Sequence, residues 1–154
     1  NISQTQILNE TCKIAISNCG LSVRETNKFI KKIKTIRNQI DKLDSFDRKL
    51  SIARVVFVPW GIALKYRDMS QYESFIHGEI TIDEIRKYIS NSKGLLDWLS
   101  EYYNQNRNVS DNFDICVVLE NIYHLIFKKK DFRYYGDDYE NMNYRNIVLP
   151  LIEF

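Results

Sequence analysis

The sequence is poor in the residues that interrupt regular structure, since its 154 positions include only five glycines and two prolines. Apolar residues make up 44% of the chain and charged residues 27%, a composition that is typical of a globular protein and excludes a disordered chain. This length corresponds to about one domain. A low content of turn-forming residues favours helices. The composition therefore predicts an all-α protein with a single core.

Cysteine and histidine are also scarce. The three cysteines, Cys12, Cys19 and Cys116, are odd in number, lack CxxC spacing and follow no signal-peptide pattern. They are therefore interpreted as reduced thiols of a cytoplasmic protein. The two histidines, His77 and His124, accompany neither a cysteine pair nor an HExxH motif, so the sequence predicts no metal site.

Long apolar runs and glycine-rich loops are absent as well. The longest apolar run, residues 55–64, includes Pro59 and Gly61 and is much shorter than the roughly 20 residues that span a bilayer. It predicts a buried helix rather than a transmembrane segment. The chain contains neither GxxxxGK[ST] nor GxGxxG, so it has no known phosphate-binding loop and is predicted to have no catalytic activity alone.

Apolar spacing and capping residues predict an irregular bundle of about seven helices. The expected helices cover residues 4–18, 23–43, 47–66, 69–76, 82–89, 93–104 and the run 111–130, in which Asp111 is the expected cap. The last run is apolar on nearly all sides and is predicted to be the central helix. A bend or break is expected at Pro59, and residues 146–154 are expected to form a short helix. No linker or repeat divides residues 1–154, which are therefore predicted to form one domain.

The clearest local signal begins at Ser22. Ser22 and Glu25 have the spacing of a capping box, which predicts that a helix begins at Val23. At 100° per residue its apolar side chains share one arc, with Ile30 at the edge. The arc consists of Phe29, Ile33, Ile36, Ile40 and Leu43.

The other face of this helix is basic. Five cations and no acid lie between residues 28 and 37: Lys28, Lys31, Lys32, Lys34 and Arg37. A solvated face is the simplest interpretation, and a nucleic-acid-binding face is an alternative hypothesis. Nucleic acid is not favoured, because no aromatic side chain interleaves with the cations to stack on bases and the net charge is only +2.

Arg24 differs from these cations. It lies in the first turn of the predicted helix, where a positive charge opposes the helix dipole by up to about 1 kcal/mol. A residue placed against its local preference often serves a partner. The pattern therefore predicts either an ion pair with Glu25 or a functional role for Arg24.

The segment LSVRETNKFIKKIKTI, residues 21–36, resembles the segment that opens the helical region after the P-loop core in the KAP family of P-loop NTPases. The apolar helix that follows it and KYRDMSQYESFIHGEI, residues 65–80, are similar to that family's buried helix, tyrosine-containing short helix and Gly-Glu-Ile exit. The resemblance covers residues 10–90, and Val23 stands where leucine is more usual. The first residue is Asn1 and a helical pattern follows directly, so a piece of a longer protein is one interpretation and a removed initiator residue is the alternative.

The resemblance implies a carboxy-terminal helical lid or regulatory region of an ATPase whose phosphate loop and magnesium-binding acid lie upstream. It implies ATP and magnesium as cofactors of that parent protein and the NTPase core as a partner. It also implies that Arg24 approaches the bound nucleotide, because an arginine at the start of a lid helix stabilises phosphate charge in related ATPases. Membrane-associated signalling and phage exclusion are implied by analogy.

A third hypothesis, beside the lid and the nucleic-acid-binding module, is a protein-interaction domain. Aromatic side chains are enriched at the centres of protein interfaces. The aromatic candidates are Trp60, Trp98, Tyr134, Tyr135 and Tyr139.

Overall fold

The computed structural model describes residues 4–40, 47–104, 114–128 and 144–154. Its helices are α1 (Gln4–Cys19), α2 (Val23–Ile40), α3 (Arg48–Arg67), α4 (Met69–Ile76), α5 (Ile82–Ile89), α6 (Lys93–Asn104), α7 (Ile115–Phe127) and α8 (Tyr144–Glu153). Within these ranges every regular element is a helix, which confirms the predicted all-α fold. The buried apolar side chains form one cluster, to which all eight of these helices contribute.

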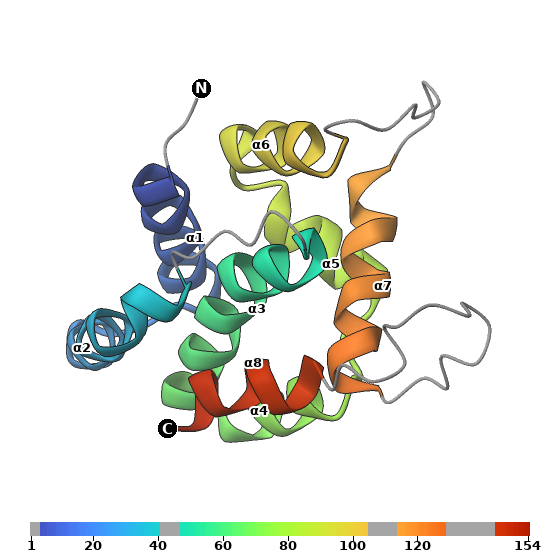
Figure 1. Ribbon diagram of the computed structural model, residues 1–154. Helices are drawn as coiled ribbons and strands as arrows, with labels where there is room; N and C mark the ends of the chain where they lie inside the picture. Colours follow the sequence, from blue (N-terminus) through green and yellow to red (C-terminus); the bar gives the residue numbers. More distant parts are fainter. Residues whose placement is uncertain (1–3, 41–46, 105–113, 129–143) are drawn as a thin grey trace.

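The centre of the molecule is α3, around which the other helices are arranged (Figure 1). Every residue from Val55 to Leu64 is buried, as expected for a helix with neighbours on all sides. The prediction that the run 111–130 forms the central helix was wrong. One face of α7 covers α3, α5 and α8, but Val117 is 42% exposed on the outer face, because apolar composition alone does not determine how many neighbours surround a helix.

The start of α2 agrees with the capping-box prediction. α1 ends at Cys19, and the φ of 65° at the next residue, Gly20, lets the Leu21 N–H donate to the Ile16 carbonyl at 3.1 Å. The Glu25 N–H then donates to the Ser22 hydroxyl at 3.2 Å, and the Ser22 N–H donates to the Glu25 carboxylate at 2.9 Å. These reciprocal bonds satisfy N–H groups that the first turn leaves without partners, and α2 begins at Val23 as predicted.

Pro59 lies inside α3 without interrupting it. The helix changes direction along its length in Figure 1, so the expected bend is present and the expected break is not. Gly61, two residues further on, allows α8 to pack closely against α3. A Cβ atom at this position would lie 2.8 Å from the Cδ1 atom of Ile152, which is closer than side-chain packing permits.

The carboxy-terminal part of the chain differs from the prediction at the cap of α7 and agrees with it at the final helix. Asp114 rather than Asp111 caps α7, since its carboxylate accepts from the Cys116 N–H at 2.9 Å and Asp111 lies outside the described residues. The expected short helix at the end of the chain is confirmed, and α8 contains Pro150. Leu43 and the tyrosine candidates at positions 134, 135 and 139 also lie outside the described residues.

Burial along α2 follows the predicted arc, which gives a matched pair of substitutions. Ile33 is 9% exposed and Ile30 is 40% exposed on the same helix. Ile33→Asp is expected to lower the free energy of unfolding by several kcal/mol, because it buries a charge without a partner. The control, Ile30→Asp, should cost less than about 1 kcal/mol. Urea unfolding followed by circular dichroism measures both, and equal losses would contradict the packing of this arc.

Candidate functional site

Arg24 is exposed in the first turn of α2. The alternative prediction, an ion pair between Arg24 and Glu25, was wrong. The Glu25 carboxylate accepts from the Ser22 N–H and lies 3.4 Å from the Nη1 atom of Arg67, and the Ser22 bond holds the pKa of Glu25 below its usual value. In the parts of the chain that the structure describes, no carboxylate pairs with Arg24. The guanidinium is therefore available to an anion from outside this domain.

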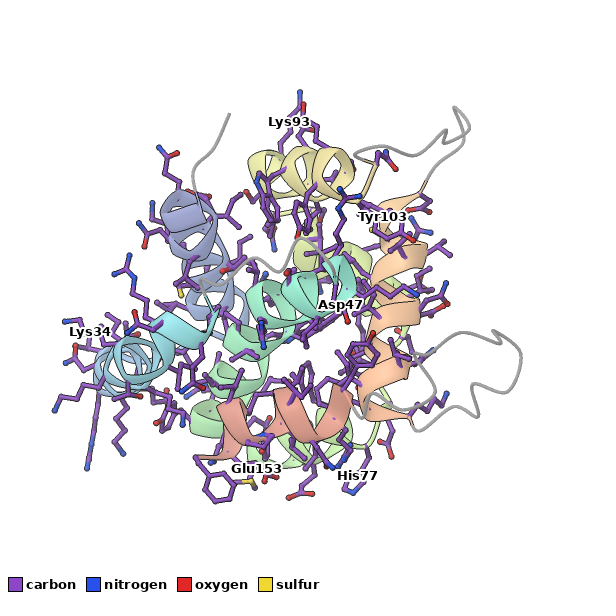
Figure 2. The ribbon with its side chains drawn as sticks, in the orientation of Figure 1. Lys34, Asp47, His77, Lys93, Tyr103 and Glu153 are labelled. Carbon is purple, nitrogen blue, oxygen red and sulfur yellow. The ribbon has the colours of Figure 1, made fainter. Side chains whose placement is uncertain are left out.

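The basic face of α2, defined as Lys28, Lys31, Lys32, Lys34 and Arg37, is directed outward. All of these side chains except Lys32 are exposed, because α2 packs mainly against α3 through its apolar arc. Figure 2 shows the α2 side chains, Lys34 among them, projecting away from the body of the molecule. Lys32 is half-buried, and its pKa is lowered. Partial burial is the larger cause, and the positive charge of Lys65 is the smaller one.

The tryptophans proposed for a protein interface lie inward. Trp60 is 6% exposed and stacks on Tyr88, and Trp98 is half-buried and stacks on Tyr102. Neither gives a free aromatic surface. The described residues contain no group of three or more histidine, cysteine, aspartate or glutamate side chains that could hold a metal ion. Of the helices in the described ranges, none has the length and apolar character needed to cross a membrane.

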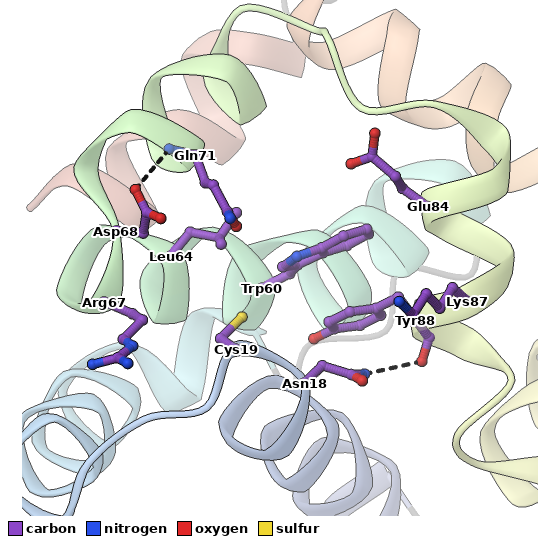
Figure 3. Close-up of a pocket in the computed structure, with 10 residues that line it drawn as sticks. All are labelled: Asn18, Cys19, Trp60, Leu64, Arg67, Asp68, Gln71, Glu84, Lys87 and Tyr88. Carbon is purple, nitrogen blue, oxygen red and sulfur yellow. Dashed lines mark hydrogen bonds between the residues drawn. The ribbon is translucent and has the colours of Figure 1, made fainter.

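A cleft of about 340 Å³ opens between the end of α1, the junction of α3 with α4, and α5 (Figure 3). No pattern in the sequence predicted this cleft. Trp60 and Leu64 of α3 form its apolar part. Tyr88 of α5 stacks on Trp60 with ring centroids 3.9 Å apart and planes inclined by 10°.

Hydrogen bonds between α1 and α5 hold one side of this cleft together. The Asn18 side-chain amide donates to the backbone carbonyl of Tyr88 at 3.2 Å, and the Asn91 side chain donates to the Asn18 side-chain oxygen. Asn18 thus links the end of α1 to the end of α5. The bond from Asn18 to Tyr88 joins residues 70 positions apart in the sequence, so the cleft depends on tertiary contacts.

The cleft has charges of both signs at its rim. Arg67 and Asp68 come from the α3–α4 junction, and Glu84 and Lys87 come from α5. The two acids are positioned by helix capping. The Asp68 carboxylate accepts from the N–H groups at the start of α4 at 3.1 Å, and the Glu84 N–H donates to the Thr81 hydroxyl at 3.2 Å.

The Tyr88 hydroxyl is an unsatisfied polar group beside the cleft. Tyr88 is 4% exposed, and its hydroxyl has no hydrogen-bond partner in the described residues. The pKa of the Tyr88 hydroxyl is raised well above its usual value, mainly by burial and to a smaller extent by the neighbouring Cys19 and Cys12. The hydroxyl therefore keeps its proton at neutral pH and remains a donor. Figure 3 shows this hydroxyl and the indole nitrogen of Trp60 both pointing toward Cys19. Burial raises the pKa of the Cys19 thiol to about 11, so that side chain is uncharged.

Tyr88 and Tyr123 provide a second matched pair of substitutions. The buried Tyr123 hydroxyl donates to the Phe75 carbonyl and accepts from the Ile80 N–H at 3.2 Å. Tyr123→Phe should therefore lower the free energy of unfolding by about 1–3 kcal/mol, because it leaves the buried Ile80 N–H without a partner, whereas the Phe75 carbonyl still accepts from the Gly78 N–H. Tyr88→Phe removes a hydroxyl that has no partner and should not lower the free energy of unfolding. Thermal unfolding tests both, and a comparable loss at Tyr88 would contradict the unsatisfied state of its hydroxyl.

Comparison with known proteins gives no assignment, since no family model, no curated protein and no solved structure matches this chain. The resemblance of residues 10–90 to the KAP family stays a hypothesis. The physical basis for a function is therefore found in the start and basic face of α2 and in the cleft.

Proposed function

We propose that this helical domain is a regulatory lid of a P-loop ATPase of the KAP type, in which Arg24 senses the bound nucleotide. The observation that carries the proposal is the exposed Arg24 guanidinium in the first turn of α2, with no ion pair to the described part of the chain. A cation there opposes the helix dipole, and an external anion would compensate that cost. A guanidinium suits phosphate because its planar N–H groups donate to two oxygens at once.

The contacts around Arg24 support this role. The capping box fixes the first turn of α2, and the Glu25–Arg67 pair joins that turn to the end of α3. The turn that carries Arg24 therefore lies beside the end of α3. In this proposal an upstream core holds ATP and magnesium, and this domain supplies no catalytic group of its own. A membrane-associated signalling assembly or a phage-exclusion assembly, with this domain in the cytoplasm, is the corresponding setting.

The test uses the full-length protein that carries this domain. Arg24→Ala is expected to lower ATP turnover at least about tenfold, since it removes a charge that acts on the phosphates. The melting temperature should change little, because Arg24 is exposed. The control is Lys28→Ala, which removes an exposed cation one turn further along α2. Unchanged turnover in Arg24→Ala, or a full-length protein that does not bind ATP, would refute the proposal.

A second candidate function is binding of nucleic acid by the basic face of α2. It is favoured by the outward direction of these cations and by the absence of any acid from Thr26 to Ile40. Cations spaced along one helix face can contact successive phosphates and release counterions. The absence of a stacking aromatic among them indicates contact with the backbone rather than readout of bases.

Fluorescence anisotropy with a labelled DNA duplex tests this second function. Binding should be strongest at low salt, and the logarithm of the affinity should fall linearly with the logarithm of salt concentration by about 0.9 for each phosphate contacted. A variant with Lys31→Gln and Lys34→Gln should show a smaller slope, whereas Lys93→Gln on α6 should not. Negligible binding of duplex and single strands at low salt would exclude this function.

A further inference from the structure

We infer that the cleft between α1, the α3–α4 junction and α5 is a binding site for a small zwitterionic molecule, with a free amino acid as the chemical class. This inference goes beyond the proposed lid function and does not depend on it. It rests on the two signs of charge at the rim, the stacked rings, the unsatisfied hydroxyl inside and the volume of the cleft.

The charges at the rim favour a ligand that carries both signs. A ligand with only negative charge would meet Asp68 and Glu84, and a ligand with only positive charge would meet Arg67 and Lys87. A zwitterion places each of its charges beside an opposite one. Lys87 is the more available cation, because Arg67 is already paired with Glu25 and no acid in the described ranges pairs with Lys87.

The inner end of the cleft supplies hydrogen-bond donors for the tip of the ligand's side chain. Figure 3 shows the Tyr88 hydroxyl and the Trp60 indole nitrogen directed to the same side, while the Glu84 carboxylate lies at the other end of the rings. A polar side-chain tip of the ligand at the inner end accepts from Tyr88 and removes the cost of burying a hydroxyl without a partner. The ligand's ammonium and carboxylate share one carbon atom, so both lie at the rim, beside Glu84 and Lys87 of α5.

The size of the cleft limits the ligand. Its volume of about 340 Å³ lies at the lower end of the 300–1,000 Å³ that is usual for small-molecule sites. A free amino acid fits this space, whereas a nucleoside triphosphate does not. The apolar side chain of Leu64 and the Trp60 indole provide a surface for the ligand's own side chain.

Trp60 makes the binding measurable. The chain has two tryptophans, so Trp98→Phe leaves Trp60 as the only one. We expect at least one of the common L-amino acids to change the Trp60 fluorescence of this variant in a saturable way at concentrations up to about 10 mM. The amine and the carboxylic acid that each lack one charge, such as 2-phenylethylamine and 3-phenylpropanoate for phenylalanine, should bind at least about tenfold more weakly.

Substitutions at the rim locate the site. In the Trp98→Phe background, Glu84→Gln and Lys87→Gln should each weaken binding by about tenfold, because each removes one charge complementary to the ligand. Both positions are exposed, and Glu84→Gln keeps the N–H bond to Thr81. Lys93→Gln on α6 is the matched control and should leave the affinity unchanged.

Tyr88→Phe tests the inner end of the cleft. It should weaken binding while circular dichroism shows an intact fold, since its hydroxyl has no partner in the described residues. The inference is overturned if no amino acid binds, or if the singly charged analogues bind as well as the zwitterion. It is also overturned if Tyr88→Phe binds the amino acid with unchanged affinity, because water alone then satisfies the Tyr88 hydroxyl. None of these readouts involves ATP, so their failure is separate from failure of the lid proposal.

Discussion

The burial of α3 on all sides is the constraint on which the rest of the structure depends. Ten consecutive residues, Val55–Leu64, are hidden, so each helix that contacts α3 must turn an apolar face inward. Polar and charged side chains are consequently directed outward or toward the ends of helices. The two candidate sites follow this rule, because one lies at the first turn of α2 and the other lies at the end of α3.

The candidate sites are physically connected at the α3–α4 junction. Arg67 pairs with Glu25 beside Arg24, and it also lines the cleft next to Asp68. The exposed pair itself contributes little to stability, so it can be exchanged at small cost. Arg67 therefore belongs to both candidate sites.

The helices and their starts could be predicted because the signals are local. Ser22 and Glu25 lie within one turn, and the arc that includes Ile33 follows from helical spacing alone. The cleft could not be predicted in this way. Trp60 and Tyr88 belong to different helices, and their stacking is a tertiary contact that no local pattern encodes. Whether the Tyr88 hydroxyl has a hydrogen-bond partner depends on the side chains that surround it in the folded protein. The cap of α7 was assigned wrongly because two aspartates, Asp111 and Asp114, precede that helix within four residues.

The close packing of α8 on α3 has a consequence for biosynthesis. α8 covers α3 at Gly61, and its Tyr144 hydroxyl donates to the Asp47 carboxylate at 2.8 Å, while Lys65 donates to the Glu153 carbonyl at 2.6 Å. A nascent chain that has left the ribosome only as far as α7 still exposes this part of α3 to water. Chaperones that recognise apolar segments would meet the domain at this stage, and synthesis of α8 would end that exposure.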